Sequence, residues 1–107
     1  MIDFIINGIL WQVKQVPPTY PMLMTSSGNF TLGCCDNADK VIYIAKGLGW
    51  QKFKKVLCHE ITHAAMFSYG IKLTIDQEEL IADILSTYGD DVITVTNRVF
   101  KKIRDGY

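Results

Sequence analysis

Residues 51–70 read QKFKKVLCHEITHAAMFSYG, and both histidines of the chain lie in this stretch, within His59-Glu60-Ile61-Thr62-His63. On an α-helix, residues four apart share a face, so His59 and His63 can offer two imidazole nitrogens to one cation. Glu60 is turned about 100° from His59, towards the open side of such a site. The stretch therefore predicts a helix that carries two metal ligands with a carboxylate beside the open metal position.

Apolar residues around the motif recur at the spacing of a helix, and they would form one buried stripe: Phe53, Val56, Leu57, Ile61, Ala64, Ala65 and Phe67. The histidines flank this stripe, and burying two imidazoles and a carboxylate without partners is costly. We therefore favour a zinc site over a helix with two solvated histidines. The helix is expected from Gln51 to Tyr69, with Gly70 as its C-terminal stop.

The third ligand must come from a carboxylate, because a catalytic zinc usually takes three protein ligands and the chain has no third histidine. The acidic segment 76–83, DQEELIAD, opens a second helix. One stripe of that helix holds small and acidic residues: Glu79, Ala82, Asp83 and Ser86. This stripe favours Glu79 as the ligand, with Glu78 as the alternative. Asp83, one turn further on, is expected to accept the free N–H of a ligating histidine and fix its tautomer.

Two capping arrangements compete for the same acidic residues. Thr74 with Gln77, or Asp76 with Glu79, has the three-residue spacing of a capping box. The first arrangement leaves Glu79 free to bind a metal. Cys58 precedes His59, but neighbouring residues on a helix lie about 100° apart, so we expect a small buried side chain there and not a ligand.

The motifs together resemble the zincin metallopeptidases that use a glutamate ligand, and in particular the small ImmA/IrrE-like proteins of prophages and mobile elements. The resemblance rests on the HEITH motif, on the later Glu79-Leu80-Ile81-Ala82-Asp83, and on the strand-like Lys40-Val41-Ile42-Tyr43-Ile44 ahead of the helix. It covers roughly residues 30 to 90. The chain differs at Leu85-Ser86, where those proteins usually have an aromatic residue followed by alanine.

The resemblance implies a minimal zincin fold and a zinc-dependent peptidase in which two histidines and one glutamate bind Zn²⁺. Glu60 would be the general base, which takes a proton from the metal-activated water and passes it to the leaving amine. A narrow regulatory protease that cuts a peptide or protein substrate is the function expected from this likeness. The alternative is a non-catalytic, zinc-stabilised interaction or regulatory module, which the intact Glu60 disfavours because a structural zinc site needs no base.

Composition agrees with a small enzyme. The 107 residues are expected to form one domain, 1–107, with its site near the surface. A formal net charge of zero and 49% apolar residues favour neither disorder nor binding to nucleic acid. No apolar run approaches the ~20 residues that span a membrane.

Targeting and cysteine patterns predict a cytoplasmic protein. The first apolar run carries Asp3 and is interrupted by Asn7-Gly8, unlike a signal peptide. The three cysteines are an odd number without C-x-x-C spacing, and a disulfide between the adjacent Cys34 and Cys35 would be strained. A reducing compartment is the simplest setting.

The remaining pattern predicts an α+β fold, with a small, mainly antiparallel sheet packed on about three helices. Four strands are expected: Ile2–Ile6 and Ile9–Val16, joined by a type I′ turn at Asn7-Gly8, then Phe30–Cys35 and Lys40–Ala45. The second helix is expected over Ile75–Tyr88, interrupted by Gly89, and a third helix, capped by Asp90 or Asp91, would run through Arg104.

Two further hypotheses concern the substrate. If the strand Lys40–Ala45 forms the sheet edge beside the active helix, it can pair with an extended peptide; with equal weight, it is an ordinary strand covered by the chain's own loop. The oxyanion of the transition state needs a donor, and the candidates nearest the motifs are Tyr43, Tyr69, Tyr88 and Arg98.

Overall fold

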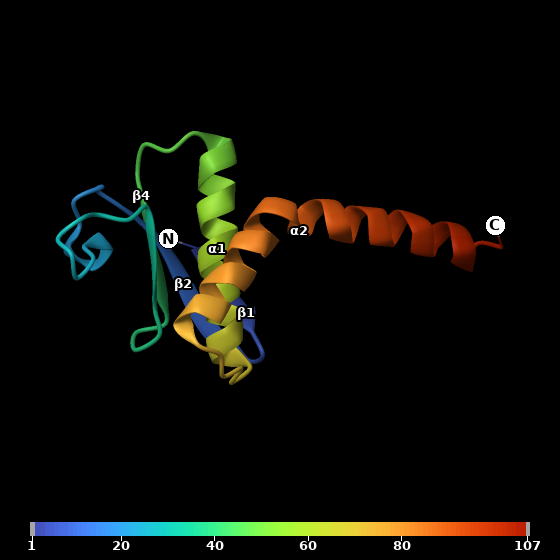
Figure 1. Cartoon of the computed structure of the whole chain (residues 1–107), viewed down its shortest axis with the longest axis horizontal. Helices are drawn as coiled ribbons and strands as arrows, with labels where there is room; N and C mark the ends of the chain where they lie inside the picture. Colours follow the sequence, from blue (N-terminus) through green and yellow to red (C-terminus); the bar gives the residue numbers. More distant parts are fainter. Residues whose placement is uncertain (1, 107) are drawn as a thin grey trace.

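The computed structural model describes residues 2–106 and has an α+β architecture, in which one helix lies on a four-stranded sheet and a second, longer helix crosses the first (Figure 1). The elements are β1 (Ile2–Ile6), β2 (Ile9–Val16), the short 3-10 helix η1 (Pro21–Leu23), β3 (Gly33–Asp36), β4 (Val41–Ala45), α1 (Trp50–Ser68) and α2 (Ile75–Arg104). No helix within residues 2–106 is long and apolar enough to cross a membrane.

The sheet is mixed, with the strand order β1-β2-β4-β3. Two of the three strand pairs are antiparallel, as expected, but β2 and β4 run parallel. The predicted turn between β1 and β2 is confirmed, since Asn7 and Gly8 have φ angles of 50° and 75°, the left-handed values that a type I′ turn requires. The third strand begins at Gly33, three residues later than expected.

Strand β4 lies inside the sheet and not at its edge, which excludes the first of the two equally weighted alternatives for Lys40–Ala45, an edge strand that pairs with a peptide. All five of its residues are buried, because one face packs on α1 and the other on η1 and the loop before it. Ile42 and Ile44 meet Trp11 of β2 on the α1 side. Such burial on both faces matches a continuous apolar sequence better than an alternating one. The edge strands are β1 and β3.

Helix α1 matches its predicted span to within one residue at each end. Its C-terminal end is tied to the β1–β2 hairpin through Ser68. The indole Nε1–H of Trp11 donates a hydrogen bond to Ser68 Oγ at 2.8 Å, and the Asn7 side-chain amide donates one to the Ser68 carbonyl at 2.9 Å. These two bonds fix the rotation of α1 about its axis relative to the sheet, and therefore the direction in which its histidines point.

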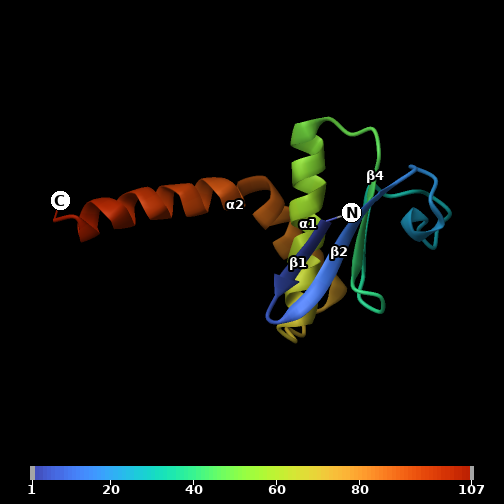
Figure 2. The same cartoon turned by 180° about the vertical axis from the view of Figure 1, so that it is seen from behind.

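Helix α2 is one continuous helix of 30 residues, so the prediction of a break at Gly89 and a separate third helix was wrong. Gly89 has no positive φ angle, and a single glycine inside a helix costs only about 1 kcal/mol relative to alanine, too little to end a long helix. Thr74 and Gln77 do form the predicted capping box at its start. The first half of α2 packs across α1 and the second half projects away from the body (Figures 1 and 2).

The continuity of α2 makes Gly89→Ala stabilising. The new methyl group would lie 3.3 Å from Cδ2 of Leu85, an exposed side chain that can turn aside. We expect alanine to stabilise the helix by about 1 kcal/mol and to slow amide hydrogen exchange in the residues after Gly89 about fivefold. Mass spectrometry or NMR of exchanging amides measures this. Gly89→Pro should instead speed exchange, and unchanged exchange in the alanine variant would contradict an unbroken helix.

Candidate metal centre

Two helices bring three potential metal ligands to one point. His59 and His63 lie one turn apart on α1, and Glu79 reaches them from the first turns of α2. The two histidine Nε2 atoms are 3.3 Å apart. Glu79 Oε2 lies 3.1 Å from Nε2 of His59, and Oε1 lies 2.9 Å from Nε2 of His63. Among residues 2–106, these three form the group whose ligand atoms are close enough to share a metal ion.

A second pair of carboxylates orients the two imidazole rings. Nδ1 of His59 lies 3.2 Å from Asp83 Oδ1, and Nδ1 of His63 lies 2.6 Å from Glu78 Oε1. A proton on each Nδ1, donated to its carboxylate, would leave the Nε2 lone pairs directed towards Glu79. Asp83 thus contacts Nδ1 of His59, the position expected from the sequence. Glu78, the alternative ligand, contacts the far side of the His63 ring and not the point of convergence.

The donor set fits a zinc ion. In tetrahedral coordination at about 2.0–2.1 Å, ligand atoms lie about 3.3–3.4 Å apart; the two histidine Nε2 atoms are 3.3 Å apart, and one ligand atom from each of His59, His63 and Glu79 can be chosen so that all three lie within 4.8 Å of one another. With Nδ1 protonated on both rings, three electron-rich atoms face one another, and a cation removes their repulsion. Protons on both Nε2 atoms would also satisfy Glu79, but they would place two imidazolium rings with nitrogens 3.3 Å apart.

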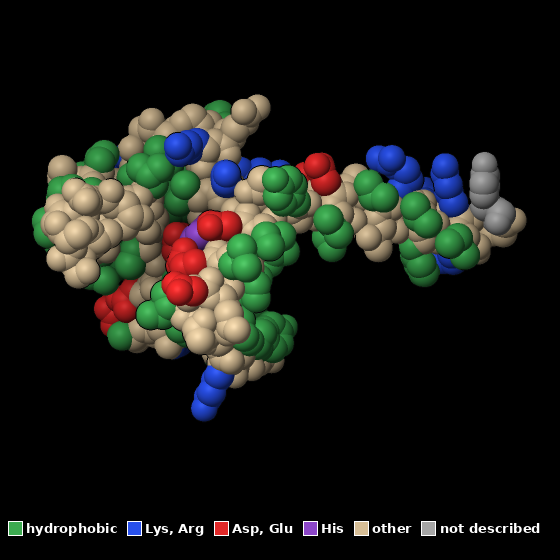
Figure 3. Space-filling model, viewed as in Figure 1, with side chains coloured by type: hydrophobic (Ala, Val, Ile, Leu, Met, Phe, Trp, Pro, Cys, Tyr) green, Lys and Arg blue, Asp and Glu red, His purple; other side chains and the backbone are tan. Residues whose placement is uncertain are grey.

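The site lies at the surface, with one side open. The His63 and His59 side chains are 11% and 20% exposed, whereas those of Glu79 and Asp83 are 49% and 68% exposed. Figure 3 shows the acidic side chains gathered around the visible edge of a histidine, in a hollow between the body and α2. An ion would enter past the carboxylates of α2, while the imidazoles stay fixed in the wall.

Glu60 projects from α1 beside the cluster and is only 7% exposed. No other side chain of residues 2–106 donates a hydrogen bond to its carboxylate. Burial raises the pKa of Glu60, and nearby Glu79 adds to this, while His59 and His63 act in the opposite direction. The arrangement holds an unpaired carboxylate next to the point where the ligands converge.

Gly33 is a site residue that the sequence analysis missed. A Cβ atom at this position would lie 2.7 Å from Cγ1 of Val56 and 3.0 Å from both Cγ and Oε2 of Glu60. Strand β3 can therefore approach α1 closely only because residue 33 has no side chain. A glycine next to a strand pattern is a known signal of such close backbone approach, so the sequence contained the clue.

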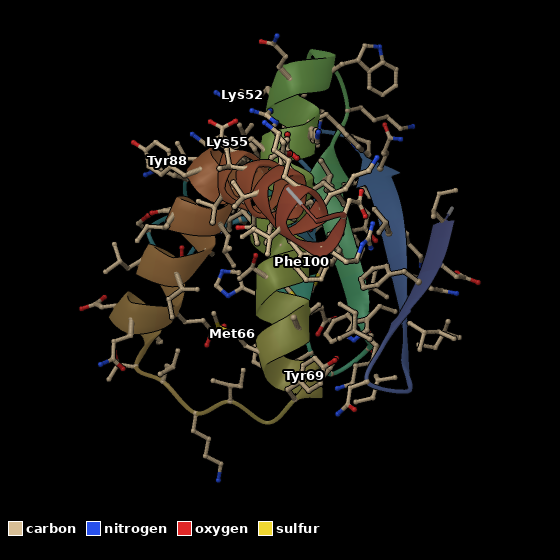
Figure 4. The ribbon with its side chains drawn as sticks, turned by 90° about the vertical axis from the view of Figure 1, so that its right-hand side faces the viewer. Lys52, Lys55, Met66, Tyr69, Tyr88 and Phe100 are labelled. Atoms are coloured by element: carbon tan, nitrogen blue, oxygen red, sulfur yellow. The ribbon has the colours of Figure 1, made fainter. Side chains whose placement is uncertain are left out.

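Two hollows meet at the cluster, one on each side of Gly33, His59 and Glu60, which line both. The first has a volume of about 550 Å³ and an apolar wall: Met22, Met24, Phe67 and Ile75. The second, of about 410 Å³, contains Lys52 and Lys55 of α1 together with Asp83 of α2. Figure 4 shows both lysines on the same side of the first half of α1. The cluster thus lies in the middle of a groove that is apolar at one end and charged at the other.

The proposed oxyanion donors do not line this groove. Tyr43 stacks on Tyr20, with ring centroids 5.4 Å apart, on the sheet face away from α1. Tyr69 and Tyr88 are each 60% exposed, and Arg98 is on the projecting part of α2. None of these four candidates is among the residues that surround either hollow.

The cysteines are free thiols, as the sequence predicted. Cys34 and Cys35 alternate across β3, and both reach the first hollow. Burial raises the pKa of both thiols, and the charge of Glu60 adds to the increase, so neither is a reactive thiolate. Cys58 is half-buried and is not part of the metal cluster.

No protein-family model, curated protein or solved structure matches this chain.

The geometry predicts one zinc ion per chain. Elemental analysis of purified protein should find it, and Glu79→Ala or His63→Ala should remove it, because each takes away one of three donors. Glu78→Gln should keep the metal but weaken binding about 10- to 100-fold, since it disturbs the ring orientation without removing a donor. Exposed Asp76, on the same turn of α2, offers the matched control Asp76→Asn, which should bind zinc like the wild type. Retention of full affinity by Glu79→Ala would contradict this ligand set.

Gly33→Ala should be harmful at a position that looks permissive in the sequence. The methyl group overlaps Val56 and the Glu60 side chain, so we expect a loss of about 1–3 kcal/mol in the free energy of unfolding. Denaturant titration measures this loss. Gly47→Ala is an informative comparison, because the φ of 90° at this position would strain an alanine although its Cβ would have no neighbouring atom within 4 Å. Zinc affinity should survive in both variants, because neither position supplies a donor.

Proposed function

We propose that this chain is a zinc-dependent metallopeptidase, with His59, His63 and Glu79 as the metal ligands and Glu60 as the general base. The observation that carries the proposal is the convergence of two Nε2 atoms and one carboxylate beside Glu60, a residue that is only 7% exposed. Zinc bound there would supply Lewis acidity, which polarises a scissile carbonyl and makes water acidic enough to act as a nucleophile near neutral pH.

The residues around the ion have separate tasks in this proposal. Asp83 and Glu78 hold the Nδ1 protons of His59 and His63, which keeps both Nε2 lone pairs available. Glu60 accepts a proton from the attacking water and delivers it to the leaving amine. Its burial suits this role, because the raised pKa strengthens the base while the neighbouring imidazoles limit the shift.

Strand β3 is the natural support for the substrate. It is an edge strand, paired with β4 on one side, and among residues 2–106 no strand occupies its other side. An extended peptide added there would form main-chain hydrogen bonds with β3 and run past Gly33 to the cluster. The absence of a side chain at Gly33 is what gives strand and helix their short separation.

The two ends of the groove differ in chemistry, so we expect each end to bind a different kind of substrate side chain. One end would take an apolar side chain, against Met24, Phe67 and neighbouring residues. The other presents Lys52 and Lys55, partly offset by Asp83, and favours an acidic side chain. We infer a peptide or protein substrate with an apolar residue on one side of the scissile bond and an acidic residue on the other.

The likeness to ImmA/IrrE-like proteins enters the proposal only as a biological setting. A regulatory protease of a phage or mobile element, acting in the cytoplasm on one protein, agrees with a small groove and three free thiols. The metal site and groove do not depend on that setting.

Glu60→Gln separates catalysis from metal binding. The zinc-loaded variant should keep one zinc per chain, because Glu60 is not a donor in the cluster, and should lose cleavage by at least 10²-fold, because the proton acceptor is gone. Wild-type and variant protein would be incubated with a library of unstructured peptides, and the new termini identified by mass spectrometry. Lys52→Glu with Lys55→Glu, tested in parallel, should shift the preference away from acidic residues.

Three outcomes would separate the alternatives. Equal cleavage by wild type and Glu60→Gln would overturn the mechanism. Bound zinc without any cleavage by the wild type would favour the non-catalytic, zinc-stabilised interaction module. Cleavage without a preference for residues flanking the bond would retain the peptidase but remove the inferred subsites.

A further inference from the structure

The projecting half of α2 carries large apolar side chains that nothing in the described chain covers. Seven of them are between 48% and 69% exposed: Tyr88, Val92, Ile93, Val95, Val99, Phe100 and Ile103. Within residues 2–106, α2 makes its substantial contacts with α1 alone, through its first half. Figure 3 shows the hydrophobic side chains gathered along one side of the projecting helix.

These residues form one face and not a scatter. At about 100° per residue, they fall within an arc of about 160°, centred near Ile103 and Val92. The opposite side of the helix carries Thr94, Arg98 and Lys101. A helix that is apolar on one side and polar on the other is built to pack against a partner along that side.

The charges on this half of the helix are divided between its ends. Asp90 and Asp91 come first, and the basic residues follow about two to four turns later: Arg98, Lys101, Lys102 and Arg104. Two such helices side by side in the same direction would place acid beside acid and base beside base. In the antiparallel direction, the acidic end of each would lie beside the basic end of the other.

The register of the antiparallel pair follows from the same geometry. Asp91 and Lys102 lie on the same flank of the apolar face, only about 20° apart around the helix. They are equally distant in sequence from the midpoint between Thr96 and Asn97. A twofold axis at that midpoint therefore places Asp91 of one copy opposite Lys102 of the other, twice, once at each end of the contact.

We propose that the projecting half of α2 is a dimerisation helix, whose partner is a second copy of this chain packed antiparallel on the apolar face, with the twofold axis between Val95 and Val99 along the helix. The charges that border the face are self-complementary under a twofold axis, as such an interface requires. A membrane surface fits less well, because Asp91 lies at the border of the apolar face, where it would meet anionic lipid. The proposal does not depend on zinc or on peptidase activity.

The metal centre stays accessible in this dimer. Glu79 and Asp83 lie in the first half of α2, about 14–20 Å along the helix from Val92. The contact at the far end would join two bodies with separate sites, one at each end of a shared pair of helices.

Sedimentation equilibrium of the full chain over a range of concentrations tests the proposal, with Val99→Glu as the disrupting variant. The wild type should have the mass of a dimer, and Val99→Glu should raise the dissociation constant by roughly 100-fold or more, because it buries a charge in the contact. Thr94→Glu adds the same charge on the opposite side of the same helix and should leave the dimer intact. Both positions are exposed, so circular dichroism should show that both variants fold.

A charge swap tests the antiparallel register. Asp91→Lys alone, or Lys102→Asp alone, should weaken the dimer about tenfold by placing like charges together, and the double variant should restore it. A monomeric wild type at high micromolar concentration would overturn the proposal; binding of that monomer to anionic lipid vesicles would assign the face to membranes instead. The proposed interface would also be overturned if Thr94→Glu weakened the dimer as much as Val99→Glu. The same holds if the double variant did not restore dimerisation.

Discussion

The contact between two histidines of α1 and three carboxylates of α2 is the interaction on which the arrangement of the helices depends. Along its 30 residues, α2 fully buries one side chain, that of Ala82, so apolar packing alone holds it weakly. His59 and His63 instead meet Glu78, Glu79 and Asp83 across the helix interface. Such paired charges stabilise little when they merely replace contacts with water, and much more when a cation binds among them. A metal ion at this point would therefore fix the position of α2 as well as complete the site.

The sheet determines the space that is available to the Glu60 side chain. Strand β4 is buried on both faces and places β3 at the edge nearest α1. Gly33 then lets β3 come close enough to confine the Glu60 side chain. Burial raises the pKa of this carboxylate, whereas the adjacent imidazoles of His59 and His63 oppose the shift. The close approach of β3 to α1 thus brings Glu60, the edge strand and the metal ligands together.

The two halves of helix α2 carry different kinds of surface. Its first half presents small and acidic residues to α1, which allows a close helix contact with carboxylates at the interface. Its second half presents an apolar face to the outside. Although α2 is continuous through Gly89, Figures 1 and 2 show that it changes direction between its two halves, so a partner bound to the second half would lie away from the metal centre.

The sequence by itself determined the features that depend on neighbours along the chain. The span of α1, the face shared by His59 and His63, the type I′ turn and the Thr74 capping box follow from periodicity and local hydrogen bonding. The stripe on α2 also singled out Glu79 and Asp83 before their contacts were known. Gly89 shows the limit of such local signals, since a single glycine costs only about 1 kcal/mol inside a helix and does not end this one.

Only the tertiary structure decided which segments meet. It placed β4 at the centre of the sheet, turned Glu78 to the far nitrogen of His63, and removed the tyrosines from the site. It also showed that Gly33 faces Glu60. These outcomes depend on strand order and on the rotation of one helix against another. Residues distant in sequence set both through packing, and no periodicity within a single segment records that packing.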